Sequence, residues 1–456
     1  MRTRSRLALL VSSVFSIALS TALAEESKSK LPEEPIPLQP VPKRPKPLLE
    51  LGEPFLGSGT LAKGFTLPTG ATWQPAFLVW GNLRSALFTI EDRDGSDKSE
   101  WGNRLDLVAQ LSLTYTERVV FSLRPLDESG KFAGYVFSPD GNDGGQTELD
   151  STVNTLFFEG DFSELFPKLD PTDSRALDFG FSVGRQPLLL QDGMLIADAM
   201  DSVGVVRNTL HLPGFSSFRV TGFYGWGHVN RGGNNAIDPS ARLFGIFTEG
   251  GTPRSTITTD FAYVMSDGLG GDGWFAGLST VQRFGGRLNS TFRGVVSRAL
   301  EQETPYTGTG VLLTSELSFT PHHTRDIAYF NAYGAFGNYT PAARGARMGG
   351  PLGRLGIHFE GSGIGAYGAA MTNRSEDVFG AVAGYQRFFN AQRGQLIFEL
   401  ATRNETTDEG VFQGGFGTRF QHALGRRFVV RLEGFAVGTE TRKPRYGART
   451  EIMVAF

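Results

Sequence analysis

From about residue 74 to its last residue, the chain alternates apolar and polar residues with a period of two. In the segment 104–115, for example, Leu105 and Leu107 fall on one face, while Arg104 and Asp106 fall on the other. Successive side chains of a strand point to opposite faces, so this pattern predicts strands with one apolar face. We expect about 18 such strands, each long enough to cross a bilayer when tilted. They are expected at 76–89, 102–115, 118–127, 152–163, 176–187, 202–210, 216–227, 240–250, 254–265, 272–283, 287–299, 309–320, 325–337, 376–388, 394–403, 409–421, 427–438 and 445–456.

The connections between these strands separate two kinds of β protein. In a soluble sandwich the apolar face would meet a core, whereas in a membrane barrel it would meet lipid and the polar face would line a lumen. A barrel alternates short periplasmic turns with longer external loops, and only the turn 164–175 is long on the expected periplasmic side. The pattern therefore predicts an all-β, transmembrane, antiparallel up-and-down barrel. The expected external loops are 90–101, 128–151, 188–201, 228–239, 266–271, 300–308, 338–375, 404–408 and 439–444.

The N-terminal segment 1–24 has the features of a secretory signal peptide. Arg2, Arg4 and Arg6 precede a largely apolar run, and Ala22-Leu23-Ala24 provides a small-residue cleavage site. A membrane anchor is the alternative, but the run is short for a spanning helix. The sequence has no cysteine, which excludes disulfides, thiolate metal sites and a cysteine nucleophile. After residue 24 no apolar run is long enough for a spanning helix, so an exported chain of this kind would be periplasmic, secreted or a closed barrel. With the strand pattern above, we expect the barrel and therefore the bacterial outer membrane.

The segment 25–73 separates the signal peptide from the barrel, which is expected to span 74–456. Prolines recur from Pro32 to Pro54, and such a run favours extended polyproline conformation over ladder hydrogen bonds. We interpret it as a Pro-rich periplasmic arm that acts as a spacer and leads into the barrel. The alternative is a docking segment for a periplasmic or inner-membrane partner.

The last strand ends on Phe456, with Ile452 and Val454 on its apolar face and Arg449 and Glu451 on its polar face. It resembles the closing strand of bacterial outer-membrane proteins, which the outer-membrane assembly machinery reads. This resemblance implies that the strand pairs with the first strand of the barrel, so that the sheet has no edge.

Charged residues recur on the polar faces of the expected strands. Rings of arginine in a lumen would favour anions and rings of acids would favour cations, while paired ladders of both would only stiffen the wall. Both readings stay open, because the two signs nearly balance. Acids that share this face also include Glu159, Asp161, Asp178, Asp260 and Glu316. The candidate pore-lining residues are Arg104, Asp106, Arg118, Arg124, Arg185, Arg219, Arg293, Glu399, Arg403, Arg419, Arg431, Glu433, Arg449 and Glu451.

Residues 100–230 carry a further resemblance. Val183-Gly184-Arg185-Gln186, followed by Gln191-Asp192-Gly193, is similar to the strand end and loop of the alginate-export family of outer-membrane barrels. Members of that family are 18-stranded barrels whose Arg-lined lumen passes an anionic polysaccharide, which implies that Arg185 faces the pore. Strict alternation from Val183 would instead point Arg185 outward, and a β-bulge at Gly184 would reconcile the two.

These observations predict a porin-like channel for passive or substrate-selective diffusion. The solutes would be small and hydrophilic or anionic, including oligosaccharide or polysaccharide. The alternative is a plugged barrel that acts in adhesion or docking through the loop 338–375 and the Pro-rich arm. The expected partners are outer-membrane lipid, the assembly machinery and the solute, while a net charge of -3 argues against nucleic acid.

No cofactor, metal or enzymatic activity is expected. The sequence lacks a Gly-x-Ser-x-Gly elbow, and its six histidines have no metal-ligand spacing. A barrel-embedded hydrolase stays open, since a triad can assemble from distant strands. The Asp- and Gly-rich segments 140–145 and 267–273 are interpreted as turns, with calcium binding as the alternative.

Overall fold

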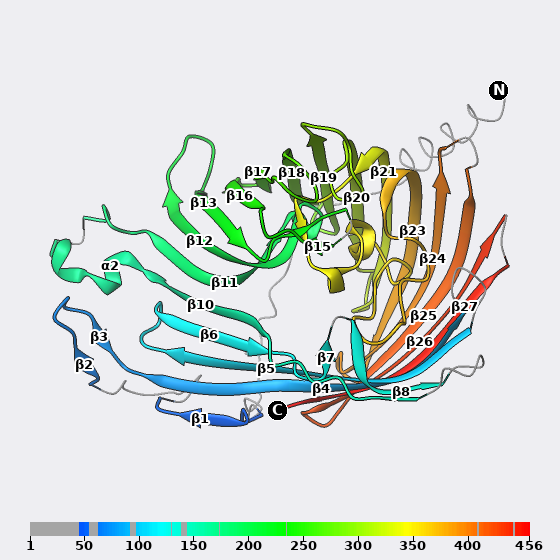
Figure 1. Ribbon diagram of the computed structural model, residues 1–456, viewed down its shortest axis with the longest axis horizontal. Helices are drawn as coiled ribbons and strands as arrows, with labels where there is room; N and C mark the ends of the chain where they lie inside the picture. The colour runs from blue at the N-terminus through cyan, green and yellow to red at the C-terminus, as the bar shows by residue number, and fades with distance from the viewer. Residues whose placement is uncertain are drawn as a thin grey trace.

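The computed structural model describes residues 45–53, 63–91, 97–128, 130–137, 144–172, 174–233, 235–407, 410–440 and 443–456. The predicted signal peptide and most of the predicted Pro-rich arm lie outside these residues. The chain forms one closed antiparallel barrel of 18 wall strands (Figure 1). The wall consists of β4 (Ala76–Glu91), β5 (Asp97–Ser112), β6 (Arg118–Leu123) continued by β8 (Lys131–Phe137), β10 (Val153–Asp161), β11 (Gly180–Leu190), β12 (Ile196–Leu210), β13 (Ser217–Gly227), β16 (Arg242–Gly251), β17 (Ser255–Met265), β18 (Gly273–Phe284), β19 (Leu288–Ala299), β20 (Gly310–Phe319), β21 (Ile327–Tyr339), β23 (Ser375–Phe389), β24 (Gly394–Glu405), β25 (Phe412–Leu424), β26 (Phe428–Thr439) and β27 (Arg445–Ala455).

The barrel closes between its last and first wall strands, as the sequence predicted. β27 pairs with β4, with Ala455 opposite Asn82. The Phe456 and Gly81 backbones then exchange hydrogen bonds of 3.0 and 2.9 Å. The short strand β1 (Leu49–Leu51) pairs with β4 just beyond this point, where β27 has ended. The two ends of the described chain thus share the closing seam, and no long edge is left unpaired there.

Connections alternate in length around the barrel. Short turns join most strands at one end, which we call the turn end, and the long connections lie at the opposite, loop end, except for 162–179 between β10 and β11, which lies at the turn end. The longest of them, 340–374, was predicted. The predicted loop 188–201 is wrong, because β11 continues to Leu190, β12 starts at Ile196, and only η2 (Gln191–Gly193) and two further residues turn the chain. Runs of consecutive apolar residues, 188–190 and 194–197, interrupt the alternation here and hid the strand ends.

The apolar faces of the wall strands point outward. Exposed large side chains such as Phe398 and Leu400 on β24, or Tyr446 and Ile452 on β27, alternate with buried ones. The intervening residues face the interior, where Glu399 is 1% exposed although it is charged. A sheet with an apolar outer face and a charged inner face is the pattern of a membrane barrel and the reverse of a soluble one.

The tip of the β11–β12 hairpin packs inside the barrel. Residues 196–200 of β12 have no partner on β13, whose pairing begins at Asp201. Instead, Leu195, Ile196 and Met200 are fully buried in a cluster with the inner faces of β16, β17 and β18. This apolar contact explains why the hairpin bends inward, since the tip would otherwise expose these side chains to water.

The loop between β21 and β23 also lies inside the barrel (Figure 1, yellow). Its short strand β22 (Ala343–Arg344) pairs with Ile196 and Ala197 of the hairpin tip and with β14 (Asn230–Arg231), which pairs with β15 (Ala236–Ile237). Two 3-10 turns follow, η3 (Ala346–Met348) and η4 (Pro351–Arg354). Leu352, Leu355 and Phe359 are fully buried against the inner faces of β19–β21, β23, β24 and β26. The core of this barrel is therefore in its lumen.

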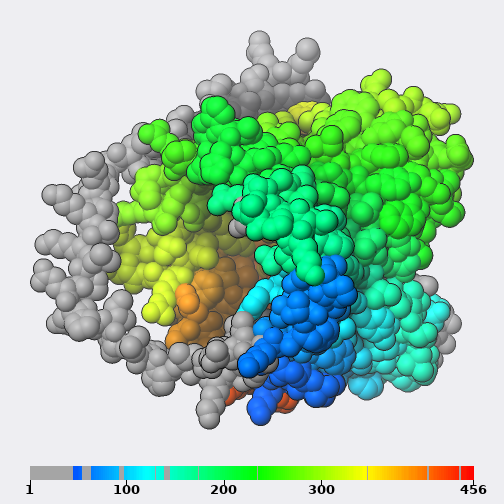
Figure 2. All heavy atoms as spheres, turned by 90° about the vertical axis from the view of Figure 1, so that its left-hand side faces the viewer, coloured from blue at the N-terminus to red at the C-terminus, as the bar shows by residue number. Residues whose placement is uncertain are grey.

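The turn end carries the small elements β2 (Phe65–Thr66), β3 (Thr72–Trp73), α2 (Phe162–Leu165) and η1 (Pro167–Leu169), while β7 (Asp127–Glu128) and β9 (Gly144–Gln146) pair with β8. Figure 2 looks onto this end and shows the blue β2–β3 segment beside the teal α2–η1 segment. Lys168 joins the two through a hydrogen bond from Nζ to the Pro68 carbonyl at 2.8 Å. No helix among the described residues is long and apolar enough to cross a membrane.

Candidate functional site

The interior of the barrel has two sides of different character. On one side, loop 340–374 packs against β4, β5, β19–β21 and β23–β27, and we call this the filled side. On the other side, β10–β13 and β16–β19 enclose a cavity of about 650 Å³, and we call this the open side. Most of the candidate pore-lining residues lie on one of the two.

A chain of alternating charges runs across the filled side. Arg84 Nε lies 2.8 Å from Glu451 Oε1, and Arg449 Nη2 lies 3.4 Å from Glu451 and 2.9 Å from Glu433. Arg419 joins Glu433 to Glu360 on the loop. The Arg449 and Glu451 side chains are 1% and 3% exposed. Buried charges need such partners, so this chain of ion pairs fixes the wall strands to one another.

Glu399 anchors the loop to the wall. Its Oε1 accepts hydrogen bonds from the His358 backbone N–H at 3.0 Å and interacts with His358 Nδ1 at 2.7 Å. Its Oε2 accepts from the Ile357 N–H at 3.0 Å and from the Tyr329 hydroxyl at 2.6 Å. Gly356 permits this approach, because a Cβ there would lie 2.6 Å from the Glu399 carboxylate. One carboxylate thus satisfies donors of the loop and of β21 together.

Arginines of the first wall strands reach the same loop through its carbonyl groups. Arg84 Nη2 donates to Ser362 O at 3.0 Å, and Arg104 Nη1 donates to Gly363 O at 2.9 Å. Arg104 and Arg124 both bind Asp106, at 2.9 and 2.8 Å. These contacts leave little free positive charge on this part of the lumen wall.

Two arginines hold the hairpin tip in place. Arg293 on β19 binds Asp192 at the tip and Glu316 on β20, the latter at 3.0 Å. Arg344 of the loop donates to the Gly193, Met348, Gly349 and Gly350 carbonyls. Burial lowers the pKa of the Arg344 guanidinium to about 10, so it stays protonated near neutral pH.

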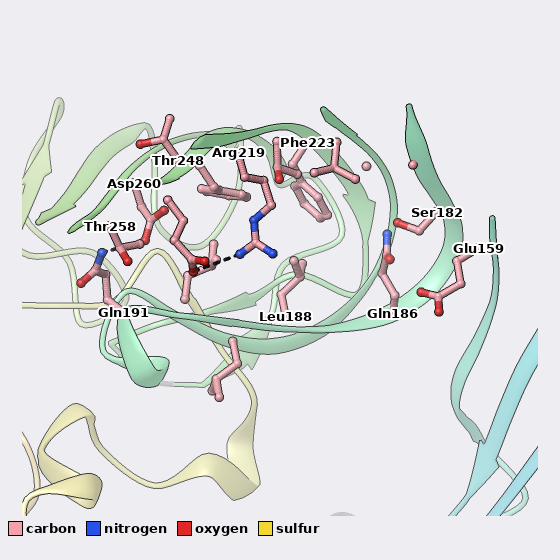
Figure 3. Close-up of a pocket in the computed structure, with 18 of the residues that line it drawn as sticks. Glu159, Ser182, Gln186, Leu188, Gln191, Arg219, Phe223, Thr248, Thr258 and Asp260 are labelled. Atoms are coloured by element: carbon pink, nitrogen blue, oxygen red, sulfur yellow. Dashed lines mark hydrogen bonds and ion pairs between the residues drawn. The ribbon is translucent and has the colours of Figure 1, made fainter. Parts of the chain in front are cut away.

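The cavity of the open side lies between the hairpin and the inner faces of β13, β16, β17 and β18 (Figure 3). Arg219 and Glu249, which are register partners on the neighbouring strands β13 and β16, form an ion pair of 3.1 Å on its wall, and both side chains are about half exposed. Asp260 and Gln191 lie at one end of the cavity and Glu159 at the other (Figure 3). Glu159 pairs with Arg118 on β6. This side therefore combines water-accessible charges with space for a small molecule.

Arg185 does not lie with either group. It pairs with Asp201 at 2.8 Å and contacts His228 at 2.7 Å, close to the loop end. The pairing of β10 with β11 runs through Gly184 without a register shift, so the bulge expected there is absent. Arg185 consequently shares the face of Val183, which is outward, although Gly184 has a positive φ of 122°. The register therefore gives no support to the pore-facing position that the resemblance implied for Arg185, and it agrees with simple alternation, which points Arg185 outward.

Two remaining candidates have local partners. Arg403 binds Glu405 at 2.6 Å and the Thr372 carbonyl at 3.1 Å, and it is 2% exposed. Arg431 donates to Gln421 Oε1 at 3.0 Å. The role of the candidate residues in permeation stays a prediction.

Several residues of the interior were missed in the sequence. Arg84 could have been found, because it alternates with the outward Leu83 on the first wall strand. Gln191, Asp192, Arg344 and His358 lie in segments interpreted as external loops, where alternation carries no signal. Their inward position depends on the bending of the hairpin and the loop, which no local pattern encodes.

The loop 267–273 behaves as a turn. Asp272 accepts hydrogen bonds from the Ser266 N–H at 3.0 Å and from the Tyr263 hydroxyl at 2.8 Å. Within the described residues, no group of three or more His, Cys, Asp or Glu side chains is placed to hold a metal ion. Residues 140–143 of the other Asp- and Gly-rich segment lie outside the described part of the chain.

Comparisons with known proteins bear on this architecture. No protein-family model matches the sequence, and no curated protein matches it. The structure is similar to a BenF-like porin from Pseudomonas fluorescens Pf-5, with a TM-score of 0.57 and 11% identity over 83% of this chain and 98% of that one. It is also similar to Pseudomonas aeruginosa OpdK with vanillate (TM-score 0.54, 14% identity, 83% and 98% covered) and OccK2 (OpdF) (TM-score 0.56, 10% identity, 83% and 97% covered). These likenesses show the fold of outer-membrane porins. The alginate-export resemblance draws no support from them and stays a prediction.

Proposed function

We propose that this protein is an outer-membrane channel through which small hydrophilic solutes diffuse passively, with selection by the constricted lumen. The observation that carries the proposal is the closed 18-strand barrel with an apolar outer face and a charged interior, which suits a wall between lipid and an aqueous path. The porin fold of the neighbouring structures supports it. In this arrangement the turn end faces the periplasm and the loop end faces the outside.

The inward loop and the hairpin tip set the size of the solute. They occupy the middle of the barrel, and a cavity of about 650 Å³ lies beside them on the open side. A path of this size suits single small molecules, so we do not extend the proposal to polysaccharide. Selection would come from the lumen width and the charges along it, without chemistry or a cofactor.

The inward loop also favours a second function, a plugged barrel that acts in adhesion or docking. Loop 340–374 buries several apolar residues inside the lumen, as a plug would. The two functions differ in one property, because only the channel carries ions across a membrane.

Planar-bilayer recording of the purified, folded full-length protein tests the proposal. A channel is expected to give discrete, stable current steps in potassium chloride, and vesicles containing it are expected to swell in small neutral solutes. Folded protein that inserts into the bilayer without any current would overturn the channel and favour the plugged barrel. Heat-modifiable migration on gels confirms that the inserted protein is folded.

A further inference from the structure

The cavity of the open side presents two hydrogen-bond acceptors that lack donors in the described part of the chain. Asp260 and Gln191 are 1% and 4% exposed. Gln191 Nε2 donates to Asp260 Oδ2 at 2.7 Å, which leaves Asp260 Oδ1 and Gln191 Oε1 without a hydrogen-bond partner. Buried polar atoms in native proteins are almost always satisfied, so a pair of orphaned acceptors on a cavity wall indicates a place for a donor-bearing ligand.

The fold brings these two groups together from distant segments. Asp260 on β17 has Phe247 of β16 and Gly277 of β18 as its register partners. Gln191 reaches it from the tip of the inward hairpin. A Cβ on Gly277 would lie 2.6 Å from Gln191 Cγ, so the glycine provides the space that the amide side chain occupies. The site is therefore built by the hairpin and two wall strands.

The charges of the cavity favour a cation. Its two lining arginines, Arg219 and Arg293, are already matched by carboxylates, at 3.1 Å to Glu249 and 3.0 Å to Glu316. Arg293 also binds Asp192. The Asp260 carboxylate, by contrast, has only the neutral Gln191 amide as a hydrogen-bonding side chain. An anion here would meet this carboxylate, whereas an ammonium or guanidinium group would supply both missing donors.

The wall beside Asp260 is partly apolar. The rings of Phe223 and Phe247 have centroids 6.0 Å apart, and both residues line the cavity with Leu188. Aromatic faces attract cations and also cover short alkyl chains. The Thr258 side chain, two residues before Asp260 on the same strand, lies on the same wall (Figure 3), whereas the Thr248 hydroxyl donates to the Thr259 carbonyl.

We propose that Asp260 and Gln191 form a binding subsite for small organic cations, namely a primary ammonium or guanidinium group on a short apolar stem. The inference rests on the proposed function, because the solute reaches the cavity by entering the lumen. The subsite gives the channel a preference for cations, whereas its many arginines would suggest a preference for anions. Those arginines are neutralised by their own carboxylate and carbonyl partners.

The test uses three probes with the same carbon chain, which are 1,4-diaminobutane, 1,4-butanediol and succinate. Binding to the full-length protein in detergent micelles is measured by calorimetry, and block of the potassium chloride current is measured in bilayers. The diamine is expected to bind and block, with affinity about tenfold or more above the diol and the dianion. Equal binding of all three probes, or tighter binding of succinate, would overturn the proposal.

Two variants assign the effect to the subsite. Asp260→Asn removes the charge, and Gly277→Ala displaces Gln191 without changing any charge. Each is expected to weaken diamine binding about tenfold. The matched control Asp267→Asn makes the same chemical change in an exposed loop residue outside the cavity and is expected to bind as the wild type does.

The two readouts separate this inference from the proposed function. If the wild-type protein gives no current but binds the diamine, and Asp260→Asn loses this binding, the channel is refuted and the subsite is retained. A wild-type protein that conducts, but binds the diamine no differently from both variants, would refute the subsite and retain the channel. Heat-modifiable migration on gels identifies any variant that fails to fold. Diamine binding by the other variant then decides whether the subsite is retained.

Discussion

The filled and open sides of the interior use the same kinds of side chain under different conditions. On the filled side, Arg449 and Glu433 lie 2.9 Å apart and are almost completely buried. On the open side, Arg219 and Glu249 lie 3.1 Å apart, yet both side chains are about half exposed. Breaking a buried pair leaves an uncompensated charge, whereas a hydrated pair contributes little to stability.

This difference shows that burial decides what a lumenal arginine does. The arginines of the filled side hold the wall and the loop together, and their charge is cancelled over short distances. On the open side, Arg219 remains in contact with water and with the cavity, where it can influence a passing solute. Three experiments test this difference between the two sides.

The largest effect is expected from shortening the inward loop. Replacing residues 351–371 with a short glycine–serine linker removes the segment that occupies the filled side, and it leaves β22 in place to hold the hairpin tip. The conductance in potassium chloride is expected to rise about threefold, because the cross-section of the aqueous path increases. Unchanged conductance in a folded variant would show that the loop does not limit the path.

A paired substitution compares the two sides directly. Arg449→Gln is expected to lower the free energy of unfolding by about 3–5 kcal/mol, because Glu433 and Glu451 lose a buried partner. Arg219→Gln makes the same change on the open side and is expected to cost about 1 kcal/mol or less. Urea unfolding of both variants in vesicles, followed by tryptophan fluorescence, provides the measurement. Equal losses of stability would remove the distinction between the two sides.

The smallest effect is expected from the anchor of the loop. Glu399→Gln keeps the shape of the side chain but presents an amide donor to the Ile357 or His358 N–H, so one hydrogen bond is lost. This costs about 1–3 kcal/mol, and the loop is expected to leave the wall about tenfold more often. Current recordings would show more frequent transient openings at unchanged main conductance. The control is Gln395→Glu, an exchange between the same two residue types on the same strand but away from the loop anchor. Its current recordings are expected to match those of the wild type.

Much of the fold follows from the alternation of residues along the chain. The period of two is a local property, so it predicted the wall strands, their outward faces, the side of the long loops and the pairing of the last strand with the first. The same pattern placed Arg104, Arg419, Arg449 and Glu451 on the inner face. Strand ends were less certain, as β12 shows, because its first residues leave the wall.

Only the tertiary structure decided which of these charges meet and which stay accessible. Arg84 and Glu451 are partners although they are 367 positions apart, and Asp260 meets Gln191 across 69 positions. Such pairs depend on barrel closure and on two segments that fold inward to bury their apolar side chains, and neither event leaves a periodic trace in the sequence. The alternating pattern thus determined the wall of this protein, whereas long-range packing inside that wall determined its lumen.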